Sequence, residues 1–333
     1  MKTPAMCLLL TILSTQVSGQ VNETEISKPI HNMIKVAAAQ ISPVFLNKGQ
    51  TVDKACNTIK EAAKNGAKLI VFPEAFIPGY PDWVWLIPNS KGAELNKLFI
   101  ELVENSVSVP DNSTELLCKA AKEHNINVVI GMNERNKESS NASIFNSMLF
   151  IDDKGNIIGK HRKLIPTGGE RLIWAQGDGS DLRSYETSAG VIGGLLCWEN
   201  YMPLARTAMY QTGMQILAAP TWDKSPNWQS SMQHVAREGG IFVISVCQAF
   251  ALEDLPERFD FKKLYPEDRE WVNQGNSCII GPNGKILAGP LEGKEGLLYA
   301  EIDLTDIIAA KRMFDAVGHY SRPDVFEFKV KVK

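Results

Sequence analysis

Apolar residues follow two alternating patterns along this chain. Five short stretches are mainly apolar and rich in small or β-branched residues, which is typical of strands buried on both faces. These stretches are residues 34–40, 68–72, 127–130, 215–219 and 241–246. Longer stretches repeat their apolar positions at helical spacing, at residues 51–65, 95–103, 116–124, 204–211 and 228–237. This alternation predicts an α/β fold.

Two β-hairpins interrupt the alternation. Apolar segments flank the turn residues Asp152–Gly155, and the segments Cys278–Ile280 and Lys285–Leu287 flank a second turn at Gly281–Gly284. Asp, Asn and Gly at such positions favour tight turns between antiparallel strands. Hairpins combined with helix–strand alternation indicate two helix-covered sheets rather than one doubly wound parallel sheet.

The composition is that of a globular protein without a strong charge. Of the 333 residues, 44% are hydrophobic and 22% are charged, and the formal net charge is −3. One large α/β domain of this length is ordinary. The chain has no long basic run, so nucleic acid is not expected as a partner.

The first residues have the pattern of a secretory signal peptide. Lys2 precedes the apolar run of residues 5–13, and small residues follow as far as Gly19. We therefore predict a signal peptide over residues 1–19, cleaved after Gly19, and a polar linker over residues 20–32. The apolar run is too short for an ordinary transmembrane helix.

Three sequons agree with entry into the secretory pathway. They begin at Asn22, Asn112 and Asn141, so we predict a glycoprotein that is secreted or resides in the secretory-pathway lumen. The charged C-terminal residues 324–333 do not form a lipid-anchor signal, so no membrane anchor is expected. Removal of Cys7 with the signal peptide leaves five of the six cysteines, an odd number that implies at least one free thiol. They form no CxxC pair, and no metal site is expected.

Cys197 occupies a position from which a thiol can do chemistry. It ends the apolar, β-branched run that starts at Val191, and Pro203 opens a helical pattern shortly afterwards. A turn of this kind lifts one side chain out of a sheet into a cleft, where a thiol is both exposed and open to activation. The alternative is a small apolar residue that closes a core strand, which is the commoner role of a cysteine.

Two charged residues follow other predicted strand ends, and a third lies close to the second of them. Glu74 comes directly after the strand that ends at Phe72, Lys163 follows the first hairpin, and Glu170 lies seven residues beyond the lysine. Groups at strand ends converge in one crevice on α/β scaffolds. Glu74 could take the proton of the thiol, Lys163 could stabilise developing negative charge, and Glu170 could orient Lys163 or a water. Taken singly, they are equally a solvated carboxylate, a basic turn and a local salt bridge with Arg171.

Three segments resemble signatures of the nitrilase branch of the nitrilase superfamily of carbon-nitrogen hydrolases. Residues 66–81 resemble the glutamate signature, and residues 163–179 are similar to the lysine segment. Residues 193–206, with the run Cys197-Trp198-Glu199-Asn200, resemble the cysteine signature. With further matching segments, the resemblance covers almost all of residues 34–325.

The resemblance implies a four-layer αββα sandwich of two mixed sheets flanked by helices. The carbon-nitrogen hydrolase domain would cover residues 33–326, followed by a short tail over residues 327–333. The family uses neither a metal nor an organic cofactor. The resemblance also implies a homodimer or a larger spiral homo-oligomer. Residues 82–107 and 253–270 are the candidate interface insertions, with solvated loops as the alternative; we expect the charged second segment to fold only against a partner.

The resemblance also assigns roles to the site residues. Cys197 would be the nucleophile, Glu74 the general base and Lys163 the group that stabilises the tetrahedral species. Glu170 matches a second, structurally important glutamate of the family. Nitrilases often carry a histidine where this chain has Gly168. We expect that departure to alter substrate preference or oligomer-linked activation.

The implied reaction converts a small-molecule nitrile into the carboxylic acid and ammonia, through a thioimidate and then a thioester on Cys197. Trp198 and Tyr80 are expected to bind the substrate. The alternatives are an amidase of the same fold, a cyanide hydratase or dihydratase, and a secreted binding protein without activity. The intact Glu74, Lys163 and Cys197 argue against the last of these.

Overall fold

Two mixed β-sheets form the centre of the computed structural model, which describes residues 33–138 and 140–331. The strand order of the first sheet is β13-β1-β2-β3-β4-β5. Its strands are β1 (Met33–Gln40), β2 (Leu69–Val71), β3 (Asn127–Arg135), β4 (Ile144–Ile151), β5 (Ile157–Arg162) and β13 (Gly296–Asp303). The neighbours β1, β2 and β3 are parallel, and the other pairs are antiparallel.

The second sheet has the order β10-β11-β9-β8-β7-β6, and β12 pairs with β11. Its strands are β6 (Tyr185–Thr187), β7 (Gly190–Gly194), β8 (Ile216–Thr221), β9 (Phe242–Cys247), β10 (Ala249–Ala251), β11 (Trp271–Ile280) and β12 (Ile286–Glu292). Strands β7, β8 and β9 are parallel neighbours, and the other pairs are antiparallel. Both sheets are therefore mixed, as the sequence predicts.

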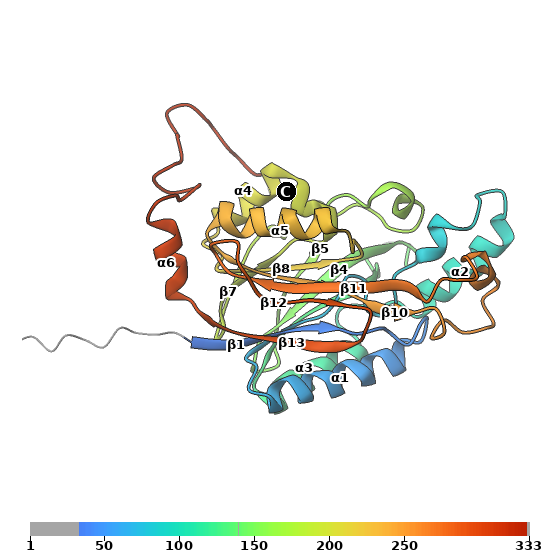
Figure 1. Ribbon diagram of the computed structural model, residues 1–333. Helices are drawn as coiled ribbons and strands as arrows, with labels where there is room; N and C mark the ends of the chain where they lie inside the picture. The colour runs from blue at the N-terminus through green and yellow to red at the C-terminus, as the bar shows by residue number, and fades with distance from the viewer. Residues whose placement is uncertain (1–32, 139, 332–333) are drawn as a thin grey trace, which may run out of the picture. The chain divides into compact units, whose positions relative to one another are not determined.

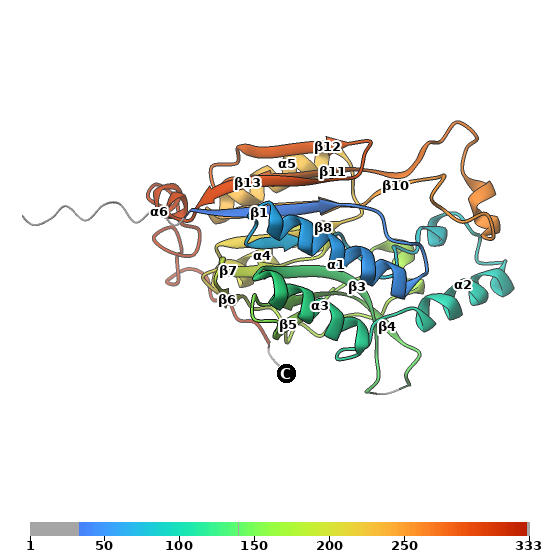
Figure 2. The ribbon, with the colours of Figure 1, turned by 90° about the horizontal axis from the view of Figure 1, so that it is seen from below.

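Helices cover the outer face of each sheet (Figure 1). Helices α1 (Lys48–Lys64) and α3 (Asn112–His124) pack on the first sheet, where Figure 2 shows them side by side. Helices α4 (Pro203–Tyr210) and α5 (Pro226–Gly239) pack on the second. The inner faces of the sheets meet in one apolar cluster that includes Val71 of β2 and Ile244 of β9. The predicted four-layer αββα sandwich is confirmed.

Helix α1 shows how local sequence sets an element. The side chain of Asn47 accepts a hydrogen bond from the backbone N–H of Gln50 and caps the helix start. The helix therefore begins at Lys48, three residues before the predicted start. Its apolar residues, such as Ile59, face the first sheet, and Gly66 follows its end with a φ of +85°.

The segments at the edges of the fold differ from the sequence prediction. The hairpin strands β11 and β12 are longer than predicted, and four short or edge elements were missed: β6, β10, β13 and helix α6 (Thr305–Lys311). Strand β13 is half-buried over residues 296–299 and fully buried only at Ala300 and Ile302, so it lacks the burial on both faces that marks the central strands.

The prediction that residues 253–270 fold only against a partner is wrong. This segment, with the short helix η4 (Asp260–Leu264), buries Phe259 and Phe261 against Phe45 and Trp83 of the same chain. Trp83 belongs to the short helix η1 (Asp82–Trp85) at the start of the other candidate insertion. The two candidate insertions therefore share one apolar cluster.

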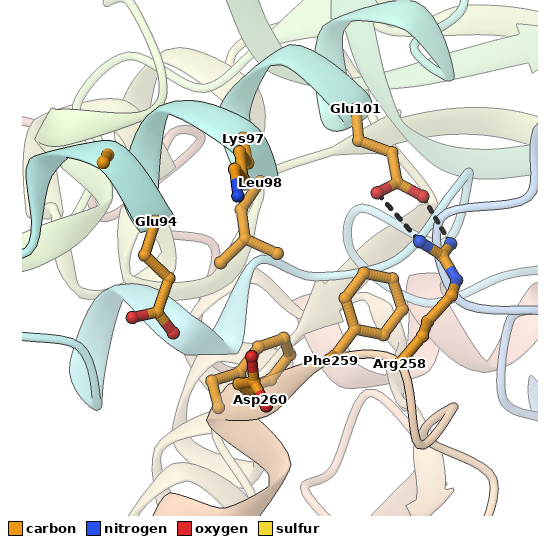
Figure 3. Close-up of a pocket in the computed structure, with 9 residues that line it drawn as sticks. Glu94, Lys97, Leu98, Glu101, Arg258, Phe259 and Asp260 are labelled. Carbon is orange, nitrogen blue, oxygen red and sulfur yellow. Dashed lines mark hydrogen bonds and ion pairs between the residues drawn. The ribbon is translucent and has the colours of Figure 1, made fainter.

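A surface cavity of about 470 Å³ lies between the two insertions (Figure 3). Helix α2 (Gly92–Glu104) supplies Glu94 and Lys97, and the second insertion supplies Arg258 and Asp260. The guanidinium group of Arg258 forms an ion pair with Glu101 of α2 at the rim. The two insertions are therefore joined by an ion pair as well as by apolar contacts.

Residues 1–32 include the predicted signal peptide, the linker and the sequon at Asn22, and they lie outside the described residues. Within residues 33–138 and 140–331, no helix combines the length and the apolar character needed to cross a bilayer. The five cysteines in this part of the chain, Cys56, Cys118, Cys197, Cys247 and Cys278, are all free thiols.

Candidate active site

The structure brings the four predicted site residues together at the ends of strands from both sheets. Glu74 follows β2 and Lys163 follows β5 in the first sheet. Glu170 lies on the short helix η2 (Gly168–Leu172), beyond the lysine. Cys197 follows β7 of the second sheet and begins the short helix η3 (Cys197–Tyr201). The four side chains are buried.

Lys163 is held between two carboxylates. Its Nζ lies 2.8 Å from Oε1 of Glu74 and 2.8 Å from Oε2 of Glu170. The amide of Asn146 donates a further hydrogen bond to Oε1 of Glu74 at 2.7 Å, and the hydroxyl of Tyr80 donates to Oε1 of Glu170 at 2.7 Å. Oε2 of Glu74 is buried and has no hydrogen-bonding partner among the described residues. That oxygen is therefore free to accept a proton.

Cys197 is held in a left-handed turn. Its φ is +50°, a conformation that costs a residue with a side chain about 1–3 kcal/mol and is concentrated at functional sites. The side-chain amide of Asn200 fixes the turn, because it donates to the carbonyls of Leu195 and Cys197 at 2.9 Å each. The hydroxyl of Thr221, at the end of β8, donates to Sγ at 3.3 Å.

The prediction of an exposed thiol is wrong, because Cys197 is only 5% exposed. Burial and the carboxylate of Glu74 raise the pKa of the thiol to about 12, although the ammonium group of Lys163 opposes both effects. The resting thiol is therefore protonated.

The two groups that would activate the thiol also have shifted pKa values. Burial raises the pKa of Glu74, although the charge of Lys163 opposes this effect. Burial disfavours the charged form of Lys163, but the carboxylate of Glu74, together with Cys197 and Glu170, outweighs this effect and raises the pKa of the lysine. The lysine therefore stays positively charged, and Glu74 has the raised proton affinity that a general base needs.

A cavity of about 360 Å³ opens above Cys197. It is lined by Tyr80, Trp85, Thr167, Glu170, Cys197, Trp198, Trp222, Asp223 and Ser225. The two residues predicted to bind substrate, Trp198 and Tyr80, are thus part of its wall. Tyr80 also stacks on Trp222, with ring centroids 4.3 Å apart and an interplanar angle of 5°.

Sequence reasoning assigned no role to four of the wall residues, Trp85, Thr167, Asp223 and Ser225. Trp85 ends the short helix η1 and Asp223 follows β8, and no local pattern shows that these two segments meet over one thiol. Gly168 lies under Trp85, because a Cβ at this glycine would be 3.1 Å from Cη2 of the tryptophan. The position where nitrilases often carry a histidine is therefore in contact with the cavity wall.

A buried network that sequence reasoning also missed joins the lysine loop to the cysteine turn. His161 Nε2 lies 2.9 Å from Oε2 of Glu199, and Nδ1 lies 2.8 Å from Oδ1 of Asp181. The carboxylate of Glu199 also accepts the backbone N–H of Leu164 at 2.7 Å and that of Leu196 at 2.6 Å. Since these residues flank Lys163 and Cys197, one carboxylate ties both loops together.

Comparison with known proteins independently supports the resemblance to carbon-nitrogen hydrolases. The family described as carbon-nitrogen hydrolase matches residues 35–312 of this chain. Nitrilase 2 of Arabidopsis thaliana is 42% identical over 308 residues, covering 90% of this chain and 88% of that protein. An aliphatic nitrilase of Sinorhizobium fredii is 40% identical over 307 residues, covering 89% of this chain and 95% of that protein.

The same fold occurs in solved structures. A carbon-nitrogen hydrolase from Helicobacter pylori superposes with a TM-score of 0.69 over 89% of this chain and 97% of that one. The two sequences are only 22% identical, so this likeness concerns the fold alone.

Proposed function

Because this chain belongs to the carbon-nitrogen hydrolase family, we propose that it is a nitrilase, an enzyme that hydrolyses a nitrile to the carboxylic acid and ammonia. The observation that carries the proposal is the meeting of a thiol, a carboxylate and an ammonium group from three chain segments at the base of one cavity. The similarity to nitrilases over most of the chain indicates that the substrate is a nitrile.

In the first step, Sγ of Cys197 attacks the nitrile carbon while its proton moves to Glu74. Oε2 of Glu74 is the oxygen available for that proton, because Oε1 is occupied by Lys163 and Asn146. The proton then passes to the nitrile nitrogen, which gives a neutral thioimidate. The ammonium group of Lys163 stabilises negative charge that develops during the addition.

A first water then attacks the thioimidate carbon, and Glu74 takes its proton. The tetrahedral species collapses with loss of ammonia and leaves a thioester on Cys197. A second water hydrolyses the thioester, which releases the carboxylic acid and returns the proton to the thiol. The balance is one nitrile and two waters to one acid and one ammonia. If the first tetrahedral species instead expels the thiol, the product is the amide.

A panel of nitriles tests the proposal. Ammonia and acid should appear in equal amounts with at least one aliphatic or aromatic nitrile, and the amide should be measured in the same samples. Cys197→Ala should abolish turnover while the circular dichroism spectrum stays unchanged, because a small side chain fits the turn. Clear turnover of amides with no product from any nitrile or from cyanide would overturn the proposal in favour of an amidase.

We also propose that the protein enters the secretory pathway and is glycosylated at Asn141. The proposal rests on the N-terminal pattern and on the exposure of Asn141 in the loop between β3 and β4. The sequon at Asn112 is a poorer acceptor, because Thr114 is buried and its hydroxyl donates to the carbonyl of Asp111 in the cap of α3. A mass loss on treatment with an N-glycosidase, absent in Asn141→Gln, would support it. An unmodified chain that keeps Met1 would contradict it.

Assembly into a homo-oligomer is a further part of the proposal. Large apolar side chains are exposed on α4, on α6 and near the C-terminus, among them Leu204, Ile308, Met313 and Phe326. Exposed apolar residues of this size are common at interfaces between subunits. Sedimentation velocity should show a dimer or a larger species, and a monomer at micromolar concentration would contradict this part.

A further inference from the structure

The wall of the cavity above Cys197 consists largely of aromatic rings. Tyr80, Trp85, Trp198 and Trp222 all line it, and Tyr80 and Trp222 are stacked. The face of an aromatic ring carries partial negative charge. It therefore attracts cations and gives no favourable contact to an anion.

Asp223 adds a formal negative charge to this wall. Its Oδ2 accepts a hydrogen bond from Nε1 of Trp198 at 2.9 Å, and its Oδ1 accepts one from the backbone N–H of Ser225 at 2.8 Å. Both donors are uncharged, so neither neutralises the carboxylate. Each oxygen also keeps a lone pair for a further donor.

No basic side chain balances Asp223 among the residues that line the cavity, all of which the structure describes. Lys163 does not line the cavity and is shared between two carboxylates at 2.8 Å each. Lys224 follows Asp223 in the chain and interacts with its charge, but it does not line the cavity, and its Nζ donates to the carbonyl of Val272 at 3.1 Å. The space above the thiol is thus surrounded by ring faces and carboxylates.

We propose that this cavity selects nitriles by their charge and that Asp223 is the specificity-determining residue. Neutral nitriles and nitriles with an ammonium group are preferred substrates, and nitriles with a carboxylate are disfavoured. An ammonium group would meet ring faces and a carboxylate that has spare acceptor capacity. A carboxylate group would lose its water without gaining a cationic partner. This selection rests on the nitrilase activity proposed above.

Three nitriles of equal length test the selection: phenylacetonitriles with an aminomethyl, a hydroxymethyl or a carboxylate group at the para position. For the wild-type protein, kcat/KM should be about tenfold higher for the aminomethyl than for the carboxylate compound, the effect of one close charge pair near a surface. The difference should lie mainly in KM, because the charge is remote from the reacting carbon.

Asp223→Asn should reduce that ratio to about threefold or less, since the aromatic walls remain. Asparagine has nearly the same shape and can still accept a hydrogen bond from Trp198. Asp260→Asn is the matched control, because it removes one negative charge from an exposed position on η4. Its ratio should equal that of the wild type. Raising the salt concentration should reduce the selection, because a charge pair near the surface is partly screened.

Binding to Cys197→Ala, measured by calorimetry, separates the selection from the activity. If the hydroxymethyl compound is not hydrolysed but the three compounds bind in the expected order, the nitrilase proposal fails and the charge selection stands. Equal affinity and equal kcat/KM for the aminomethyl and carboxylate compounds would overturn the charge selection. An unchanged ratio in Asp223→Asn would overturn the role of Asp223.

Discussion

His161→Gln should destabilise the protein strongly at neutral pH and much less at pH 10. His161 is 2% exposed and lies between two carboxylates, those of Glu199 and Asp181. Burial by itself would lower the pKa of the imidazole, but the charge of Glu199 and the hydrogen bond to Asp181 outweigh it and raise the pKa to about 10. The ring is therefore an imidazolium ion at neutral pH.

Two estimates of the magnitude agree. Removal of one partner of a buried ion pair costs about 3–5 kcal/mol, because the remaining charge is left uncompensated. A pKa raised from 6.5 to about 10 corresponds to about 5 kcal/mol at most, since each pH unit is worth 1.36 kcal/mol. The pKa is higher in the folded than in the unfolded state. The stabilisation is therefore complete below pH 6.5 and is lost as the pH rises through 10.

Urea denaturation of both proteins at pH 6, 8 and 10 provides the assay. The difference in free energy of unfolding between wild type and His161→Gln should fall from about 3–5 kcal/mol at pH 6 to under about 1 kcal/mol at pH 10. The control is His234→Gln on α5, whose imidazole is 67% exposed and pairs with Glu238. It should cost less than about 0.5 kcal/mol at each pH.

A difference below about 1 kcal/mol at pH 6, or one that does not change with pH, would refute the reasoning. Activity provides a second readout. Glu199 accepts hydrogen bonds from the backbone N–H groups of Leu164 and Leu196. If Glu199 shifts after the loss of His161, the adjacent residues Lys163 and Cys197 should therefore shift as well. A shift of about 1 Å lowers kcat about a hundredfold.

Three further substitutions test other parts of the site. Glu74→Gln should lower kcat by about 10²–10⁴-fold, measured as ammonia release on the folded variant, because the amide cannot take the thiol proton. Gly131→Ala should lower stability by about 1–3 kcal/mol in urea denaturation, because its Cβ would lie 2.1 Å from the carbonyl oxygen of Pro73. Tyr80→Phe should cost about 1 kcal/mol of stability and raise KM, since it removes the hydroxyl that donates to Glu170 and lines the cavity. A kcat equal to that of the wild type would contradict the role of Glu74. An unchanged free energy of unfolding would contradict the steric role of Gly131, and an unchanged KM would contradict the role of Tyr80.

The central strands could be predicted because burial on both faces leaves a continuous apolar run. Strand β9 is buried at every position, and its sequence contains only one polar residue other than cysteine. The edge strand β12 alternates between half-buried and exposed positions and includes Gly289 and Pro290, so its sequence resembles that of a loop. Residues 253–270 were misjudged for a related reason. The segment contains many charged residues, so its sequence pattern does not indicate that Phe259 and Phe261 are buried. Their burial depends on aromatic residues elsewhere in the chain.

The candidate site also has a part that the sequence predicts and a part that it does not. Glu74, Lys163 and Cys197 could be found because each follows a strand, and a resemblance to a known family adds to that local signal. The network of His161 and Glu199 joins residues 38 positions apart, and nothing local shows that these two side chains meet. The wall of the cavity likewise depends on how loops from both sheets come together.

A buried thiol with a pKa of about 12 is a poor nucleophile by itself, yet burial need not slow the reaction. Burial raises the pKa of Glu74 as well, so it disfavours the anionic form of both groups. Transfer of the proton from Sγ to Glu74 moves one negative charge over a short distance and creates none. The desolvation costs of the two anions therefore largely offset each other, and Lys163 stays beside the charge in both states. The same burial keeps the resting sulfur as a protonated thiol, the form that reacts least with oxidants. A site closed in this way could therefore keep its nucleophile reduced in the oxidising compartment that the N-terminal sequence predicts.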